Sequence, residues 1–219
     1  MKRKLYKAMM AKLSYGFGSA FIVILVALHF IKPEIDPSWN FISEYQTGNH
    51  GWIMSLAFFS LAMSCIFLSI ALWRQARSII GKIGLLGLMA AATGMIIAGV
   101  CKTDPLNTAP NLVTRSGELH QLGATLDQIP FAIILVSISL LRNNPFWKER
   151  KVLLIALIVM VWIGLFTFIA SLAMQFPADR VFGPAVAVGW QNRLMIVTQA
   201  IWLIVIADQE MRKVKSEKL

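Results

Sequence analysis

The most regular feature of the sequence is a succession of long apolar runs separated by polar segments. Six runs are almost free of charge, and they cover residues 15–31, 52–73, 83–100, 131–141, 152–174 and 194–206. A helix needs about 20 predominantly apolar residues to cross the hydrocarbon of a bilayer. The pattern therefore predicts an all-α protein, an integral membrane six-helix bundle formed as one domain over residues 1–219. The predicted spans are residues 13–31, 51–74, 80–101, 119–141, 152–174 and 190–208.

Composition agrees with this pattern. Of the 219 residues, 57% are hydrophobic and only 15% are charged, whereas soluble domains average about 45–50% apolar and roughly 25% charged residues. The fourth and sixth spans reach full length only when the polar residues at their starts are included. Those two starts are therefore the first places to look for function.

The distribution of basic residues predicts the orientation of the bundle. With the N-terminus placed in the cytoplasm, sixteen of the 21 Lys and Arg residues fall on the cytoplasmic side. They are Lys2, Arg3, Lys4, Lys7, Lys12, Arg74, Arg77, Lys82, Arg142, Lys148, Arg150, Lys151, Arg212, Lys213, Lys215 and Lys218. The other side keeps Lys32, Lys102, Arg115, Arg180 and Arg193. By the positive-inside rule, both termini are expected in the cytoplasm, with the chain in the cell (inner or plasma) membrane.

The net charge of +10 is then mostly an orientation signal and an attraction to anionic lipid headgroups, so membrane lipids are the expected partners. No nucleic-acid partner is expected, because no aromatic residues are interleaved with the basic tail.

The first outer connection contains the segment "NFISEYQTGNHGW", residues 40–52. Asp36-Pro37 is a helix-start signal, and Trp39, Ile42 and Tyr45 follow at i, i+3 and i+6, on one helical face. This spacing predicts a short helix lying in the membrane interface with its aromatic face toward lipid.

The start of the fourth span carries the sharpest polar pattern. The stretch "ELHQLGATLDQIP" puts Asp127 two turns after His120 and on the same helical face, and Pro130 is expected to kink the helix beside Asp127. A carboxylate inside the hydrocarbon normally faces the bundle interior with a partner. Arg193, at the start of the sixth span, is the natural candidate for a bidentate pair. Such a pair either joins two helices or forms the charged floor of an outward pocket.

Further ionisable residues gather on the predicted outer face. The candidate ligand-binding residues are Glu44, Tyr45, His50, Asp104, His120, Asp127 and Arg193. We interpret residues 40–52 as a lid whose Glu44 and His50 face His120 and Asp104 across the outer mouth. The alternative is a surface connector whose Glu44 meets only water.

The segments "FISEYQTGNHGWIMSLAFFSLAMSCIFLSIAL" and "CKTDP…SGELHQLGA" resemble an uncharacterised family of six-helix prokaryotic membrane proteins, filed as a domain of unknown function. The matching positions are Ser43 with Glu44, Asp104, and Gly117 with His120. The sequence departs from the family pattern at Tyr45-Gln46 and at Gln121, where glycine is typical. The resemblance implies a six-helix membrane fold and no established activity.

Three functions remain open. The preferred one is an outward-facing polar pocket that binds or transports a lipid or small amphiphile. The second is a membrane-embedded metal-dependent lipid hydrolase, with His120, Glu44 and Asp104 as catalytic candidates and His50, His120 and Asp104 as candidate zinc ligands. The third is a structural membrane subunit without a ligand.

Neither the Gly-x-Ser-x-Gly motif of hydrolases nor the His-Glu-x-x-His motif of metalloproteases occurs in the sequence. A haem held by His29 and His120 is a minor further possibility, since the two histidines could lie at matched depth. The sequence itself names no cofactor, substrate or oligomeric state.

Overall fold

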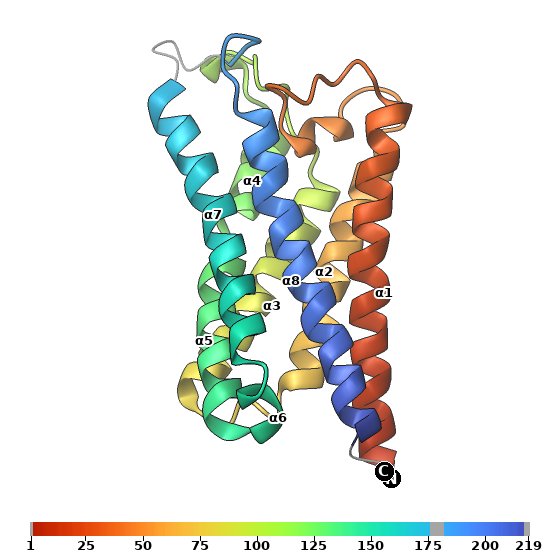
Figure 1. Cartoon of the computed structure of the whole chain (residues 1–219). Coiled ribbons are helices and arrows are strands. Elements are labelled where there is room, and N and C mark those ends of the chain that lie inside the picture. The colour runs from red at the N-terminus through yellow and green to blue at the C-terminus, as the bar shows by residue number, and fades with distance from the viewer. Residues whose placement is uncertain (1, 176–181, 217–219) are drawn as a thin grey trace.

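The computed structural model of the protein describes residues 2–175 and 182–216, and every regular element in these ranges is a helix (Figure 1). The elements are α1 (Lys2–Ile31), η1 (Ile42–Gln46), α2 (Trp52–Leu72), α3 (Ile79–Val100), η2 (Pro110–Leu112), α4 (Arg115–Thr125), α5 (Ile129–Asn143), α6 (Pro145–Lys148), α7 (Lys151–Gln175) and α8 (Gly189–Ser216). Within the described ranges, six segments are long and apolar enough to cross a membrane. The predicted all-α, six-span architecture is confirmed. Arg180 and Lys218, which entered the orientation argument, lie outside the described residues.

The fourth span is broken in the middle. The helix α4 ends at Thr125 and α5 begins at Ile129. Pro130 lies in the first turn of α5, where its missing N–H costs nothing. The Asp127 carboxylate accepts a hydrogen bond from the backbone N–H of Ile129 at 3.2 Å and so caps α5. The expected disturbance beside Asp127 is therefore an interruption of the helix, with a polar side chain at the break.

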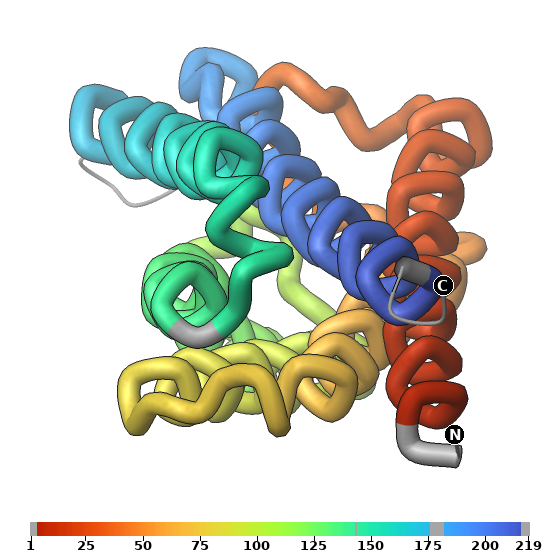
Figure 2. The backbone as a smooth tube through the Cα atoms, turned by 60° about the horizontal axis from the view of Figure 1, so that its bottom comes forward, coloured from red at the N-terminus to blue at the C-terminus, as the bar shows by residue number. Residues whose placement is uncertain are grey.

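The helices surround one continuous apolar core, which includes the fully buried Phe21, Leu88, Ile133 and Trp202. The helix α8 packs against both α1 and α7, while α2 lies between α1 and α3, and α3 also packs on α5 (Figure 2). Reciprocal hydrogen bonds join α1 to α2, because the hydroxyls of Ser14 and Ser64 each donate to the other residue's carbonyl at 2.9 Å. The helix α7 is the most peripheral of the long apolar helices.

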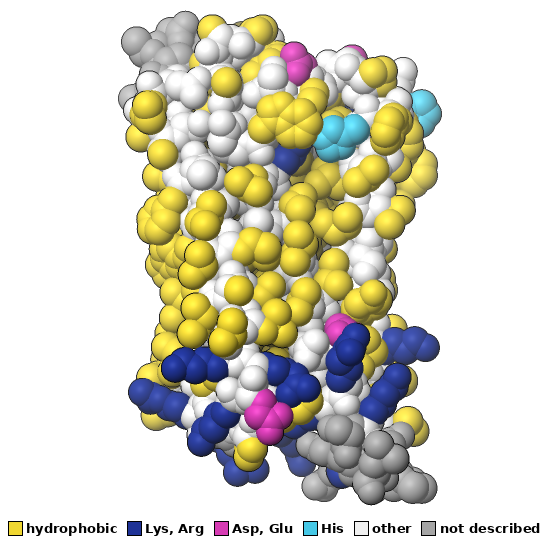
Figure 3. Space-filling model, in the orientation of Figure 1, with side chains coloured by type: hydrophobic (Ala, Val, Ile, Leu, Met, Phe, Trp, Pro, Cys, Tyr) yellow, Lys and Arg dark blue, Asp and Glu magenta, His cyan; other side chains and the backbone are white. Residues whose placement is uncertain are grey.

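Both termini lie at one end of the bundle (Figure 1). Lys and Arg side chains gather at this end, which we call the basic end, whereas an apolar belt covers the middle and histidines appear near the opposite end (Figure 3). The positive-inside rule assigns the end with the excess of Lys and Arg to the cytoplasm. The cytoplasmic location of the basic end stays a prediction.

A buried polar network closes the basic end. Glu210 of α8 is fully buried and forms an ion pair with Lys7 of α1 at 2.5 Å. It also accepts a hydrogen bond from the Gln75 amide at 2.7 Å. The Gln75 carbonyl in turn accepts from the Trp147 indole at 3.2 Å and from the Lys213 ammonium. These contacts join α1, α6 and α8 to the segment after α2.

The opposite end, which we call the loop end, carries the long connections and η1. The short helix predicted in the first connection exists as a 3₁₀ turn over Ile42–Gln46. Its expected orientation is wrong, because Ile42 and Tyr45 are buried in the protein instead of facing lipid. The Tyr45 hydroxyl accepts a hydrogen bond from the Arg193 guanidinium at 3.2 Å, and the Tyr45 ring lies beside the His29 ring, so the turn is tied to α8 and α1.

Candidate functional site

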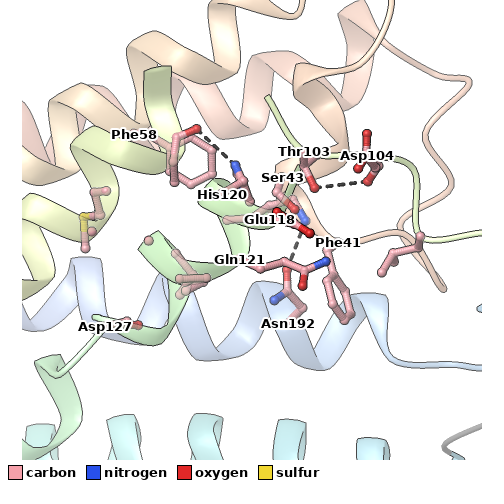
Figure 4. Close-up of a pocket in the computed structure, with 18 of the residues that line it drawn as sticks. Phe41, Ser43, Phe58, Thr103, Asp104, Glu118, His120, Gln121, Asp127 and Asn192 are labelled. Atoms are coloured by element: carbon pink, nitrogen blue, oxygen red, sulfur yellow. Dashed lines mark hydrogen bonds between the residues drawn. The ribbon is translucent and has the colours of Figure 1, made fainter. Parts of the chain in front are cut away.

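A cavity of about 760 Å³ opens at the loop end and extends into the bundle (Figure 4). Its walls come from α2, α3, α4 and α8, from the first two loop-end connections, and from Asp127 at the break, Phe168 of α7 and Phe182 of the third connection. Apolar residues dominate the lining and include Phe41, Phe58, Leu61, Met95, Phe168 and Met195. The polar lining residues include Ser43, Asp104, Glu118, His120, Gln121, Asp127 and Asn192. The predicted site residues Asp104, His120 and Asp127 thus share one cavity.

His120 is held in one orientation by the end of α3. Its Nδ1 lies 3.1 Å from the carbonyl oxygen of Ala98 and 2.9 Å from that of Cys101. Because a carbonyl oxygen only accepts, Nδ1 must carry a hydrogen, and the neutral ring then has its lone pair on Nε2. The ring meets Phe58 edge-on, with 5.7 Å between centroids. His120 is thus a preorganised side chain with an acceptor nitrogen.

The Asp104 side chain accepts hydrogen bonds at the start of α4. Its carboxylate accepts from the backbone N–H of Thr114 at 2.7 Å and from the Thr114 hydroxyl at 3.0 Å. A negative charge is favourable beside a helix N-terminus. Residue 117 must be glycine here, because an added Cβ would lie 2.1 Å from the Asp104 carboxylate. Asp104 therefore fixes the entrance of the cavity in addition to lining it.

Glu44 supports the cavity wall from behind. The side chain is only 3% exposed, and its carboxylate accepts from the Asn40 amide at 2.7 Å and from the backbone N–H groups of Phe41 and Leu106. These contacts tie the first loop-end connection to the second. Burial raises the pKa of Glu44 above its ordinary value, and the hydrogen bonds from Leu106 and Asn40 offset part of that rise.

The segment 40–52 is consequently one wall of the cavity, since Phe41, Ile42 and Ser43 line it. The water-facing alternative for Glu44 is wrong, because the carboxylate is buried in protein contacts. The predicted approach of Glu44 and His50 to His120 is not seen. His50 is exposed in a left-handed conformation with φ of 60°, and it does not line the cavity.

Tyr45 and Arg193 belong to a second cluster, beside α1. The Arg193 guanidinium donates to Nε2 of His29 at 3.0 Å, to the Tyr45 hydroxyl at 3.2 Å and to the carbonyl oxygens of Asn40 and Gly189 at 2.7 and 3.0 Å. The predicted Asp127–Arg193 pair is wrong. The residue of α8 beside Asp127 is Gln199, which lies six residues, or about 9 Å along the helix axis, beyond Arg193, and Arg193 makes its contacts with His29 and Tyr45.

Asp127 instead lies near Gln199, six residues further along α8. Gln199 is fully buried and its amide lies close to the Asp127 carboxylate, but its amide oxygen has no hydrogen-bond partner within the described residues. Unsatisfied buried polar atoms are rare and call for an explanation. Asp127, which lines the cavity, therefore has a buried amide beside it, and no arginine among the described residues pairs with it.

The candidate zinc ligands do not come together. In the part of the chain that the structure describes, no group of three or more His, Cys, Asp or Glu residues is arranged to hold a metal ion. The haem pairing of His29 with His120 also lacks support, because both ring nitrogens of His29 are engaged, Nδ1 by the Leu25 carbonyl and Nε2 by Arg193.

Sequence reasoning missed two buried amides that shape the cavity wall. The Gln46 amide donates to the Ala98 carbonyl at 2.8 Å, and the Asn192 side-chain oxygen accepts from the backbone N–H of Ile42 at 3.0 Å. Asn192 sits in the polar start of the sixth span, so its position was a usable signal. Gln46 carried no signal, since a single amide in a polar loop is ordinary.

Comparison with known proteins identifies a family whose function is not known. No curated protein and no solved structure matches the chain. Residues 16–208 match the family described as "Protein of unknown function (DUF998)". Because that match covers most of the chain, including the cavity, four whole spans and more than half of the first and sixth, the protein belongs to this membrane-protein family of unknown function.

Proposed function

We propose that the protein binds a small amphiphile in the cavity at the loop end, which faces away from the cytoplasm. The observation that carries the proposal is the lining, in which apolar and aromatic walls surround a few convergent polar groups. Small-molecule sites usually have this composition and a volume of about 300–1,000 Å³, and the cavity measures about 760 Å³. An apolar tail would lie along Phe58, Met95 and Phe168, with the polar group near His120.

The packing of α4 supports entry from the lipid side. The helix packs on α3 and makes no extensive contact with α7 or α8. Leu122 of α4 is 55% exposed, and Phe168 of α7 lines the same cavity. An amphiphile dissolved in the outer leaflet could therefore reach the cavity without crossing bulk water.

The proposal can be tested with a neutral monoacylglycerol that carries a photoactivatable diazirine in its chain. The protein is reconstituted in nanodiscs and illuminated, and the labelled peptides are identified by mass spectrometry. We expect labelling of the cavity residues Met95 and Met195. The variant Ala124→Trp places an indole on an exposed position of the cavity wall and should abolish this labelling.

A matched control is Ala170→Trp, on an exposed position of α7 outside this cavity, which should leave the labelling unchanged. Labelling confined to lipid-facing residues such as Met174, with no effect of Ala124→Trp, would contradict the proposal. It would favour a structural membrane subunit without a ligand.

A further inference from the structure

The ionisable residues that line the cavity are unusual for this chain. They are Asp104, Glu118, His120 and Asp127, with no Lys or Arg among the described lining residues. The whole sequence has 21 Lys and Arg against 11 Asp and Glu. Arg115 approaches Glu118 only at 3.8 Å in an exposed pair, and such pairs contribute little. The cavity is thus an acidic site in a strongly basic protein.

The deepest of these carboxylates, Asp127, has no cationic partner among the residues that the structure describes. Asp127 lies between Arg115 and Arg142, near the middle of the fourth span. Its carboxylate contacts the backbone N–H of Ile129 and the neighbouring Gln199 amide. A carboxylate at this depth is expensive unless it is paired. Because Arg193 is held by His29 and Tyr45, the described part of the chain does not supply a cation for Asp127.

The groups around Asp127 would also favour a cation. The buried Gln199 amide has an oxygen that makes no hydrogen bond among the described residues, and the neutral His120 ring keeps an acceptor nitrogen because Nδ1 donates to α3. The aromatic side chains of Phe41, Phe58 and Phe168 line the same space. Aromatic faces attract cations, and the attraction strengthens when water is excluded.

We infer that the ligand of this cavity is an organic cation, a protonated amine or an onium group with apolar substituents, whose charge is paired by Asp127. This inference rests on the proposed function and adds the sign of the charge. The ligand supplies the missing partner of the half-buried Asp127 carboxylate, while its apolar groups lie against the aromatic walls. The described lining accommodates a cation and offers no cationic side chain to an anionic head group.

The test uses two hydrophobic ions of matching shape and opposite charge, tetraphenylphosphonium and tetraphenylborate. Each competes with the photoactivatable monoacylglycerol for labelling of Met95 and Met195 in nanodiscs. We expect tetraphenylphosphonium to displace the probe at a concentration at least about tenfold lower than tetraphenylborate, a ratio that corresponds to about 1.4 kcal/mol. Asp127→Asn should remove most of this difference, and Asp127→Glu should restore part of it.

Two further variants separate an effect of the cavity charge from a general loss of acid or from misfolding. Asp208→Asn removes an acid near the basic end and should leave the selectivity unchanged. Gln121→Lys adds a positive charge at an exposed lining position and should weaken displacement by tetraphenylphosphonium even if Asp127→Asn fails to fold. Equal displacement by the two ions, or selectivity that survives both Asp127→Asn and Gln121→Lys, would overturn the inference while leaving amphiphile binding intact. Absence of cavity labelling in the unmodified protein would overturn both proposals.

Discussion

Arg193 is a buried cation whose partners are mostly neutral. Its side chain is 4% exposed, and its hydrogen bonds go to His29, to Tyr45 and to backbone carbonyls. We expect Arg193→Gln and Tyr45→Phe to be coupled in a double-mutant cycle by about 0.5–3 kcal/mol, as for residues in one network. Arg193→Gln and Asp127→Asn should be additive. Thermal unfolding in detergent measures both cycles, and a strong coupling between positions 127 and 193 would contradict the arrangement of α8.

Glu44 leads to a pH-dependent prediction. Since burial raises its pKa above the ordinary value of 4.5, the folded protein binds this proton more tightly than the unfolded chain does. The resulting stabilisation is complete below about pH 4.5 and is lost as the pH rises through the folded-state pKa. The melting temperature of the unmodified protein relative to Glu44→Gln should therefore be highest at the acid end and fall toward neutral pH.

This comparison requires melting curves of both proteins at several pH values. Glu118→Gln, at an exposed carboxyl of the same end, controls for a general change of surface charge. A difference between the unmodified protein and Glu44→Gln that rises with pH would show that the hydrogen bonds from Leu106 and Asn40 outweigh desolvation.

At the scale of elements, the contact between α3 and α4 depends on two glycines. A Cβ on Gly94 would lie 2.3 Å from the Gly123 carbonyl oxygen, and a Cβ on Gly123 would lie 2.6 Å from that of Gly94. We expect Gly94→Ala to separate the helices and to cost about 1–3 kcal/mol, the usual penalty for overpacking. Gly16→Ala is the control, because nothing lies within 4 Å of its added Cβ. Equal melting temperatures for the two variants would refute this close packing.

The elements themselves were predictable from the sequence. Apolar length determines whether a segment can span a bilayer, and Pro130 marked the place where the fourth span breaks. The meeting of His120, Asp104 and Asp127 in one cavity also followed from their predicted depth and side of the membrane.

The partners of individual side chains were less predictable. Depth along a helix can be counted in the sequence, but the rotation of a helix about its axis is set by its packing against neighbours. The shift of one packed helix along another is set in the same way, so Arg193 was given the wrong partner, and Gln199, six residues further along α8, is the residue beside Asp127. The burial of Tyr45 was missed for a similar reason, because an aromatic face fits protein as well as lipid.

At the scale of the whole molecule, the separation of a basic end from a loop end predicts the topology. Both termini and Arg77 should be cytoplasmic, and Pro110, an exposed residue of the loop end, should lie outside. In a Cys101→Ser background, Pro110→Cys should react with an impermeant maleimide in intact cells. Arg77→Cys should react only after lysis. The reverse pattern would invert the orientation and place the cavity on the cytoplasmic face.

The break in the fourth span also has a consequence for biosynthesis. Its apolar half, α5, has 15 residues and extends about 22 Å, short of the roughly 30 Å of hydrocarbon. The rest of the span is α4, which carries Arg115, Glu118 and His120. This segment should therefore leave the translocon inefficiently by itself and should enter the bilayer once α3 is present to receive it. In a glycosylation-mapping assay, residues 115–142 alone should insert poorly, and residues 52–142 should insert well.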